Sequence, residues 1–327
     1  MISPRMAQSE FVEVQFVVEP NYSGWRLDKY LCHKIPRLSR TRVQQIIARD
    51  MICERKLKPS SLVSPGLAFR LRKRVLEEPD TPSCIDEIHR DDALIIVDKP
   101  AGLPIHPSAR YHQGTLVTLL AERYGPDAKP TPIHRLNRET SGIVVCGCQP
   151  DATRRLMSAF ANGEVHKEYL AICEGWPTRD EFEVDAPLAE GGLFIRIAMR
   201  VDPQAGKPSR TSFRVVRRFQ RGNARFALLR ALPRTGRQHQ IRAHLREAGF
   251  PIVGDKIYGP DERYFDRFSK RCLEPEAWVR LRLPRHALHA ARIRFRHPTL
   301  DSEVQFDSSL PADLREFIPT ECDTNAV

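Results

Sequence analysis

The chain has 327 residues, of which 41% are hydrophobic and 28% are charged, so it has the composition and length of a globular protein with one large and one small domain. No apolar run approaches the roughly 20 residues of a membrane-spanning helix, and the first residues lack the apolar core of a signal peptide. We therefore expect a cytoplasmic protein without membrane attachment. Its eight cysteines are scattered without a framework spacing and are expected to be reduced.

The net charge of +11 is concentrated in one short block of the chain. Residues 26–75 contain 14 Lys and Arg against 3 Asp and Glu, whereas the remainder contains 38 of each sign. A generally basic, well-solvated surface would spread the excess along the whole chain. Concentration in about fifty residues is typical of a surface that binds a phosphate backbone.

This basic block is predicted to contain two helices and a small sheet. Residues 11–18 alternate loosely and predict an edge strand before it. A first helix is expected over 25–35 and a second after Ser39, which is a plausible N-cap. Short apolar runs separated by turns follow Asp50 and predict the sheet. The expected buried faces are Leu27, Leu31 and Ile35 in the first helix and Val43, Ile46 and Ile47 in the second.

The same block resembles the S4-like RNA-binding domain. The matching segments read RLDKYL, LSRTRVQQII and SLVSPGLAFRL, although Glu54-Arg55-Lys56 stands where that domain usually has an Asn-Gly turn. The resemblance implies an S4-like α/β domain over residues 1–75, including the N-terminal strand. It also implies that the RNA-binding residues around the second helix are Arg37, Arg40, Arg42 and Arg49.

A second, larger domain is predicted after a linker. Residues 76–84 are acidic, contain proline and lack periodicity, so we interpret them as the linker. From Ile85 onward short β-type runs dominate and helical stretches are few. This pattern favours an α+β domain with a mixed, largely antiparallel sheet over residues 85–317. Residues 318–327 are expected to be a disordered tail.

Five segments of the larger domain occur in an order that identifies a family. IHRLNRETSGIVV at 133–145 is a polar, glycine-containing loop that runs into a buried strand, and such loops often carry functional side chains. Together with the other four segments it resembles the motifs of the RluA family of RNA pseudouridine synthases. The other four are LIIVDKPAGLPIHPSARYHQGTLVTLL at 94–120, HKEYLAICEG at 166–175, TGRQHQIRAHLREAGFPIVGDKIYG at 235–259 and RHALHAARIRFRHP at 285–298.

The resemblance implies a reaction and a set of site residues. Enzymes of this family cut the bond between uracil and ribose, rotate the extruded base and rejoin it through a ring carbon, without a cofactor. Asn137 stands at the position of the family's catalytic aspartate, and Arg242 is the cation that pairs with that acid. Tyr169 stacks on the uracil, Arg135 enters the RNA, and Leu288 lines the pocket. The implied substrate is uridine in structured ribosomal or transfer RNA, and we expect a monomer with no obligate protein partner.

Residue types alone allow other interpretations. Tyr169 lies in an apolar run and would ordinarily be a core residue, and Arg135 or Arg242 alone would be a surface or phosphate contact. Lys99 could be an amine nucleophile, but its Pro-Ala-Gly turn favours a structural role. His134 is more plausible as a hydrogen-bonded part of its loop than as a general base. The two nearby cysteines at 146 and 148 lack further ligands, so we expect no metal site.

Asn137 makes the activity the open question of this sequence. An amide is a poor proton acceptor and a poor nucleophile, so the chemistry should suffer while fold and RNA binding survive. Glu139 and Asp255 are expected to be structural rather than replacements, and Arg242 is expected to lose its balancing charge. Natural loss of catalysis, an inactivating substitution and a residual mechanism all fit. The sequence therefore predicts either a pseudouridine synthase or a catalytically silent RNA-binding or RNA-folding factor.

Overall fold

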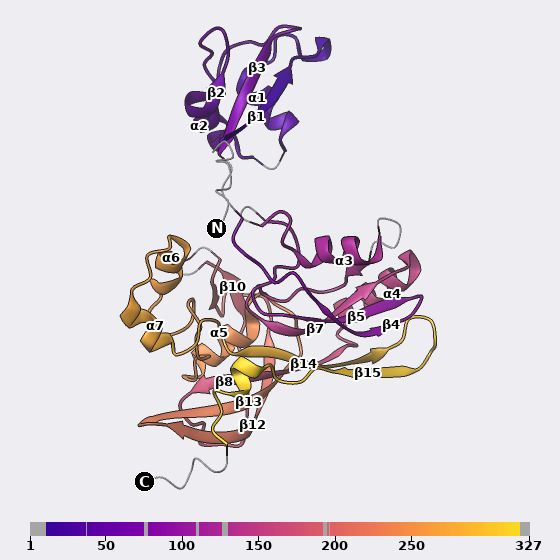
Figure 1. Cartoon of the computed structure of the whole chain (residues 1–327), viewed down its shortest axis with the longest axis vertical. Coiled ribbons are helices and arrows are strands. Elements are labelled where there is room, and N and C mark those ends of the chain that lie inside the picture. Colours follow the sequence, from indigo (N-terminus) through magenta and orange to yellow (C-terminus); the bar gives the residue numbers. More distant parts are fainter. Residues whose placement is uncertain are drawn as a thin grey trace, which may run out of the picture. The chain divides into compact units, whose positions relative to one another are not determined.

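The computed structural model describes residues 11–36, 38–74, 78–108, 111–125, 130–191, 195 and 197–320. Within these the chain divides into two compact units, residues 1–77 and residues 78–327 (Figure 1). The predicted RNA-binding residue Arg37 and the predicted tail from 321 onward lie outside the described residues.

Unit 1 contains the predicted strand, two helices and small sheet. Its sheet has the order β1-β3-β2 and is antiparallel, so β1 is an edge strand as predicted. The first helix begins after Arg26, two residues later than predicted, because Arg26 is extended and bridges to Leu62. The Ser39 side chain accepts a hydrogen bond from the backbone of Arg42 and caps the second helix, which confirms its predicted role. The elements are β1 (Phe11–Val17), η1 (Pro20–Tyr22), α1 (Leu27–Lys34), α2 (Arg40–Asp50), β2 (Met51–Ile52) and β3 (Ala68–Arg74).

The predicted apolar faces of both helices pack on this sheet. Leu27, Leu31, Val43 and Ile47 are buried, while Ile35 and Ile46 are partly buried at the edge of the same core. Five further residues complete the core, namely Tyr30 of α1 and, between and along the strands, Val18, Val63, Phe69 and Leu71. Helical periodicity therefore identified the inner faces correctly.

A buried carboxylate orders two arginines on the surface of unit 1. The Asp28 side chain is fully buried and accepts hydrogen bonds from Arg26 at 3.0 and 3.1 Å and from Arg40 at 3.0 and 3.2 Å. Gln44 donates a further bond at 3.2 Å. These donors hold the pKa of Asp28 well below its usual range. Arg40, a predicted RNA-binding residue, is thus fixed in place and shares one negative charge with Arg26.

Unit 2 is built on a ten-stranded mixed sheet with the order β4-β5-β7-β14-β8-β13-β12-β9, where β15 pairs with β14 and β6 with β7. Among the described strands only β7 and β14 pair in parallel, which confirms the predicted α+β fold with a mixed, largely antiparallel sheet. The sheet strands are β4 (Asp86–Arg90), β5 (Leu94–Lys99), β6 (Thr131–Pro132), β7 (Ser141–Gly147), β8 (His166–Glu174), β9 (Glu181–Asp185), β12 (Arg210–Arg221), β13 (Ala224–Pro233), β14 (Leu288–Arg296) and β15 (Glu303–Asp307), and a separate pair is formed by β10 (Leu188–Glu190) and β11 (Met199–Val201).

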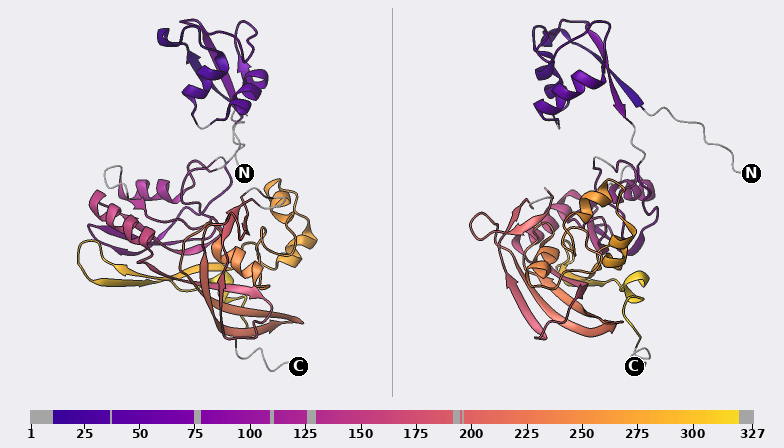
Figure 2. Two further views of the ribbon diagram at one scale, coloured as in Figure 1. Left: turned by 180° about the vertical axis from the view of Figure 1, so that it is seen from behind. Right: turned by 90° about the vertical axis from the view of Figure 1, so that its left-hand side faces the viewer.

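Helices cover both faces of this sheet (Figure 2). The buried Leu116 and Leu120 of α3 pack with Ile95 of β5, whereas Leu156 of α4 packs with the adjacent Ile96. Because successive strand residues face opposite sides, α3 and α4 lie on opposite faces. The helices are α3 (Leu116–Tyr124), α4 (Pro150–Asn162), α5 (Gln240–Glu247), α6 (Tyr264–Ser269), α7 (Pro275–Leu281) and α8 (Ala312–Arg315).

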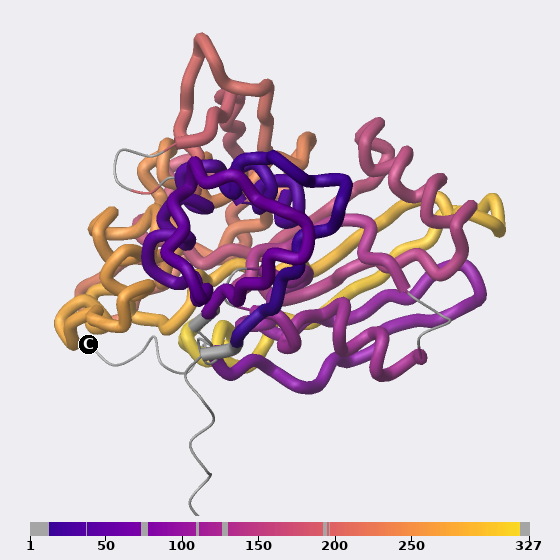
Figure 3. The backbone as a smooth tube through the Cα atoms, turned by 90° about the horizontal axis from the view of Figure 1, so that it is seen from above, coloured from indigo at the N-terminus to yellow at the C-terminus, as the bar shows by residue number. Residues whose placement is uncertain are grey.

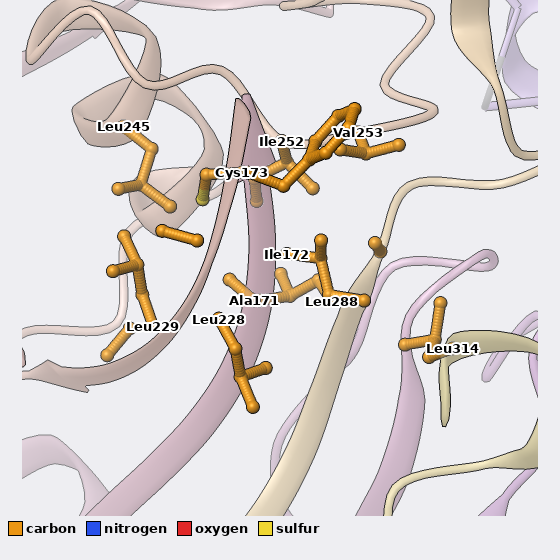
Figure 4. Packing of buried hydrophobic residues seen from close by; sticks show 14 of the residues in the cluster. Ala171, Ile172, Cys173, Leu228, Leu229, Leu245, Ile252, Val253, Leu288 and Leu314 are labelled. Carbon is orange, nitrogen blue, oxygen red and sulfur yellow. The ribbon is translucent and has the colours of Figure 1, made fainter. Parts of the chain in front are cut away.

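The last long strand, β14, occupies the middle of the sheet between β7 and β8 (Figure 3). Gly142 of β7 lies so close to it that a Cβ atom there would approach the Ala290 carbonyl oxygen to 2.2 Å, and its φ is +109°. Only glycine fits such a contact. Figure 4 shows the hydrophobic core between β14, β8 and β13. Leu288 of β14, Leu229 of β13 and Leu245 of α5 belong to this one buried cluster.

The two ends of unit 2 are held by contacts. Glu78, in the predicted linker, accepts hydrogen bonds from the backbone of Gln113 and Gly114. Ile318, in the predicted disordered tail, packs against the main core cluster, so that prediction is wrong for this residue. No helix among the described residues is both long and apolar enough to cross a membrane.

Candidate active site

The loop that carries Asn137 joins β6 to β7, and hydrogen bonds with two side chains hold it in place. The buried Lys99 ammonium donates to the carbonyl oxygens of Pro100, Leu103 and Arg138 at 2.8, 2.9 and 3.1 Å. Its burial, with repulsion from neighbouring arginines, lowers the pKa of Lys99 to about 7. His134 Nε2 accepts the Val145 N–H at 3.1 Å, and burial lowers the pKa of His134 to about 3. The structural interpretation of both residues is thereby confirmed.

The five predicted site residues of unit 2 line one cavity of about 470 Å³. Its wall also contains Lys167 and Arg237, so the lining is rich in cations. The site residues come from separate parts of the chain, namely the loop before β7, strand β8, helix α5 and strand β14. They are Arg135, Asn137, Tyr169, Arg242 and Leu288.

Tyr169 belongs both to the core and to the cavity wall. Its ring packs against the clusters on either side of the sheet centre, and it pairs across the strands with Ala290. It also lines the cavity. Burial raises the pKa of Tyr169 to about 12, so the phenol stays protonated at neutral pH. The two interpretations of this residue are therefore compatible: the packing fixes a ring that borders the cavity.

Arg242 is paired with Asp255 rather than left without a counter-charge. Its Nε and Nη2 atoms donate to the two carboxylate oxygens at 2.6 and 2.7 Å, and both side chains are at most 5% exposed. The remaining Nη1 lies 3.5 Å from the Asn137 side-chain oxygen. The prediction that Asn137 would leave Arg242 unbalanced is wrong, because the Asp255 carboxylate supplies the charge. The Arg242 guanidinium in turn lowers the pKa of Asp255 against the effect of burial.

No free carboxylate replaces the missing acid in the described part of the cavity. Asp255 also accepts from the backbone N–H groups of Ile257 and Tyr258, both at Oδ1. Glu139 accepts from Lys256 at 3.0 and 3.1 Å and from Arg138 at 3.0 Å. None of the described residues that line the cavity is an Asp or Glu. The predicted structural roles of Glu139 and Asp255 are confirmed by these contacts.

A buried glutamine holds the loop that precedes α5. The Gln240 side-chain oxygen accepts from Thr235 at 2.6 Å and from the Arg237 backbone at 3.0 Å. Its amide nitrogen donates to the Arg210 carbonyl and the Thr211 hydroxyl, both at 3.0 Å. With all these bonds made, Gln240 fixes the start of the helix that presents Arg242.

Sequence reasoning missed three functional contributions: Gln240 as the loop anchor, Asp255 as the partner of Arg242, and His239 in the cavity wall. A signal existed for Asp255, because an acid within the apolar run PIVGDKIYG must be paired if it is buried. No comparable signal marked Gln240. The remaining predicted RNA-binding residues Arg40, Arg42 and Arg49 are exposed on α2 of unit 1.

The chain is similar to known proteins over most of its length. The profile of a family described as RNA pseudouridylate synthase matches residues 93–247. An uncharacterized RNA pseudouridine synthase of Chloroflexus aurantiacus is 33% identical over 312 residues, covering 91% of this chain and 90% of that protein. Ribosomal large subunit pseudouridine synthase D of Escherichia coli is 31% identical over 321 residues, 94% of each chain.

Two solved human structures are similar to most of this chain. Human RNA pseudouridylate synthase domain containing 4 superposes with a TM-score of 0.55 at 26% identity, covering 70% of this chain and 90% of that chain. Human RNA pseudouridylate synthase domain containing 1 superposes with a TM-score of 0.56 at 24% identity, covering 71% and 86%. The folds therefore agree across most of both human chains.

Proposed function

Because the chain belongs to the RluA family of RNA pseudouridine synthases, which are isomerases, we propose that its cavity receives a uridine of structured RNA and converts it to pseudouridine. The observation that carries the proposal is the meeting of five separately positioned residues around one cavity of about 470 Å³. The names of several relatives favour the RNA of the large ribosomal subunit as substrate, with transfer RNA as the alternative. The protein works in the cytoplasm as a monomer.

Each residue has a distinct role in this proposal. The Tyr169 ring stacks on the extruded uracil, and Leu288 closes the apolar side of the cavity. Arg242, held by Asp255, orients the side chain at position 137 beside the ribose. Arg135 is exposed at the cavity and takes the place of the base in the RNA. Asn137 lowers the rate of the isomerisation, since its amide cannot do the work of a carboxylate.

The test is tritium release from RNA labelled at carbon 5 of uracil. Joining ribose to carbon 5 expels the tritium from that carbon, so release reports the rejoining step itself. The native chain in excess over an unmodified large-subunit transcript should release tritium slowly but above the protein-free rate. Absence of release from both the native chain and its Asn137→Asp variant would contradict a synthase that acts on large-subunit RNA.

A second candidate function is supported by the missing acid. No Asp or Glu is among the described residues that line the cavity, yet the residues that would hold the nucleotide are all present. This favours a silent RNA-binding or RNA-folding factor that keeps the synthase scaffold. Tight binding of the transcript without any release from the native chain would select this function.

Replacing Tyr169 with alanine is expected to weaken binding of RNA that carries 5-fluorouridine. Stacking of a base on an aromatic ring contributes roughly 1–3 kcal/mol, so the dissociation constant should rise by about one to two orders of magnitude. Filter binding on labelled transcripts measures the change. Tyr169→Phe retains the ring and is the matched control. Equal loss in both variants would show that the ring is not the contact.

Unit 1 is proposed to be an S4-like RNA-binding domain that acts through exposed arginines of α2. If Arg42 contacts one phosphate, Arg42→Gln should reduce the slope of log affinity against log salt concentration by about 0.7–0.9. Binding titrations over a range of salt concentrations measure this slope. Arg292→Gln, which removes a cation paired with Asp307 in unit 2, is the control and should leave the slope unchanged. An unchanged slope in both variants would show that Arg42 does not contact a phosphate of the RNA.

A further inference from the structure

His239 stands in the wall between two cavities. It lines the cavity of the site residues, and it also lines a second cavity of about 500 Å³. Arg135, Asn137 and Arg242 line both cavities as well, so His239 lies among the residues of the proposed site. It is half-buried, immediately before helix α5.

The backbone of His239 has an unusual conformation. Its φ is 54° and its ψ is 15°, in the left-handed region that residues other than glycine seldom adopt. Such a conformation costs roughly 1–2 kcal/mol for a residue with a Cβ atom. The side chain makes no capping hydrogen bond to the helix that would offset this cost. Glycine would adopt this turn without that cost.

One ring nitrogen of His239 is already bound, which determines where the proton lies. The Tyr258 hydroxyl accepts the Met199 N–H at 2.7 Å and lies 3.0 Å from His239 Nδ1. Tyr258 is buried, and its hydroxyl has no other hydrogen-bond partner among the described residues. This arrangement favours donation of the hydroxyl proton to Nδ1, which leaves the imidazole proton on Nε2.

The ring is also kept neutral. Burial and the nearby Arg242 guanidinium lower the pKa of His239 to about 3. Nε2 has no hydrogen-bond partner among the described residues. His239, a residue of the cavity wall, thus carries one neutral N–H group without a partner among the described residues.

We propose that His239 recognises the base of the bound nucleotide, donating its Nε2–H to the uracil oxygen at position 4 and thereby selecting uracil over cytosine. The inference rests on the proposed function. A neutral donor matches the uracil oxygen at position 4, whereas cytosine has an amino group at that position, and two donors would oppose each other. Phosphate oxygens are the less suitable partners, because Arg135, Lys167 and Arg237 offer them cations at the same cavity.

The tautomer can be measured in the native chain. Long-range nitrogen–proton NMR spectra of the histidine rings, with His239 assigned by its loss in His239→Asn, should show protonated Nε2 and unprotonated Nδ1. Protonated Nδ1 would overturn the proposal, whatever any variant does. Tyr258→Phe should allow both tautomers, since the hydroxyl that selects one of them is gone.

Selectivity is tested with mononucleotides and two matched variants. Saturation-transfer NMR compares uridine 5′-monophosphate, cytidine 5′-monophosphate and ribose 5-phosphate on the native chain, His239→Asn and His239→Gln. Asparagine tolerates the left-handed backbone but its amide stops at the position of Nδ1, whereas the glutamine amide reaches that of Nε2. The native chain should prefer the uridine nucleotide by roughly three- to tenfold, the worth of one neutral hydrogen bond. The preference should disappear in the Asn variant and partly return in the Gln variant.

The outcomes separate the inference from the function on which it rests. Undiminished preference for the uridine nucleotide in His239→Asn would overturn the role of His239 and leave the function intact. An equal loss of ribose 5-phosphate binding in that variant would also overturn it, because the contact would then be to phosphate. Failure of the native chain to bind both the uridine nucleotide and the RNA transcript would instead refute the proposed function.

Discussion

The Asn137→Asp variant is expected to release tritium from uracil-labelled transcripts at least about a hundredfold faster than the native chain. A positioned general base alone contributes roughly 10²–10⁴ in rate, and a covalent role would add to this. The scaffold needs no other change, because Arg242 already lies 3.5 Å from the side-chain oxygen at position 137. A carboxylate there would receive a charge-assisted hydrogen bond from the free edge of that guanidinium. Single-turnover release on an unmodified large-subunit transcript is the measurement.

Two controls show whether the carboxylate itself causes this gain. Asn137→Ser keeps a small polar group without a carboxylate and should stay as slow as the native chain. The Asn137→Asp, Arg242→Gln double variant should lose much of the gain, because the acid is then no longer oriented. Equally fast release from the native chain and the Asp variant would mean that another group performs the chemistry.

Asp255→Ala is expected to reduce the free energy of unfolding by roughly 3–5 kcal/mol, the usual cost of breaking a buried ion pair. It leaves the Arg242 guanidinium, which is almost fully buried, without a counter-charge. Equilibrium unfolding in urea measures the change. The pKa of Asp255 is lowered in the folded chain, so its contribution is complete above the ordinary aspartate pKa and is lost as the pH falls below it.

The matched control for this prediction is an exposed ion pair between β14 and β15 of unit 2. Asp307 pairs with Arg292, and both side chains are about half exposed (52% and 44%). Asp307→Ala should cost at most about 1 kcal/mol, because solvent screens the pair. Similar losses of unfolding free energy in both variants would mean that burial does not make the Arg242–Asp255 pair more important for stability than an exposed pair.

Local periodicity predicted local structure well and long-range order poorly. The inner faces of α1 and α2 followed from residues three and four apart, and the Ser39 cap followed from its side-chain chemistry. The position of β14 between β7 and β8 did not, because strand order depends on contacts between residues far apart in sequence. The packing of Ile318 on the core was missed for the same reason.

In the candidate site, too, the sequence predicted individual residues but not their contacts with distant parts of the chain. Motif resemblance named Tyr169, Arg242 and Leu288, and these residues do line one cavity with Asn137. The hydrogen bonds and ion pairs that support these residues were not predicted. Arg242 and Asp255, for example, form an ion pair although no sequence periodicity relates their positions. The orientation of the His239 ring depends likewise on a hydroxyl nineteen residues away. Hydrogen-bond partners of buried polar groups had to be seen in three dimensions.

The central position of β14 also determines the order in which parts of the molecule can fold during synthesis. Strands β5 and β7 on one side, and β8 and β13 on the other, are synthesised long before Leu288 emerges. Until that strand is inserted, the described strands of the two halves of the sheet share no pairing, and Leu288 is not yet in the cavity wall. Unit 1 needs only the first 77 residues and can fold early during translation. A nascent chain can therefore form unit 1 well before Leu288 completes the wall of the cavity.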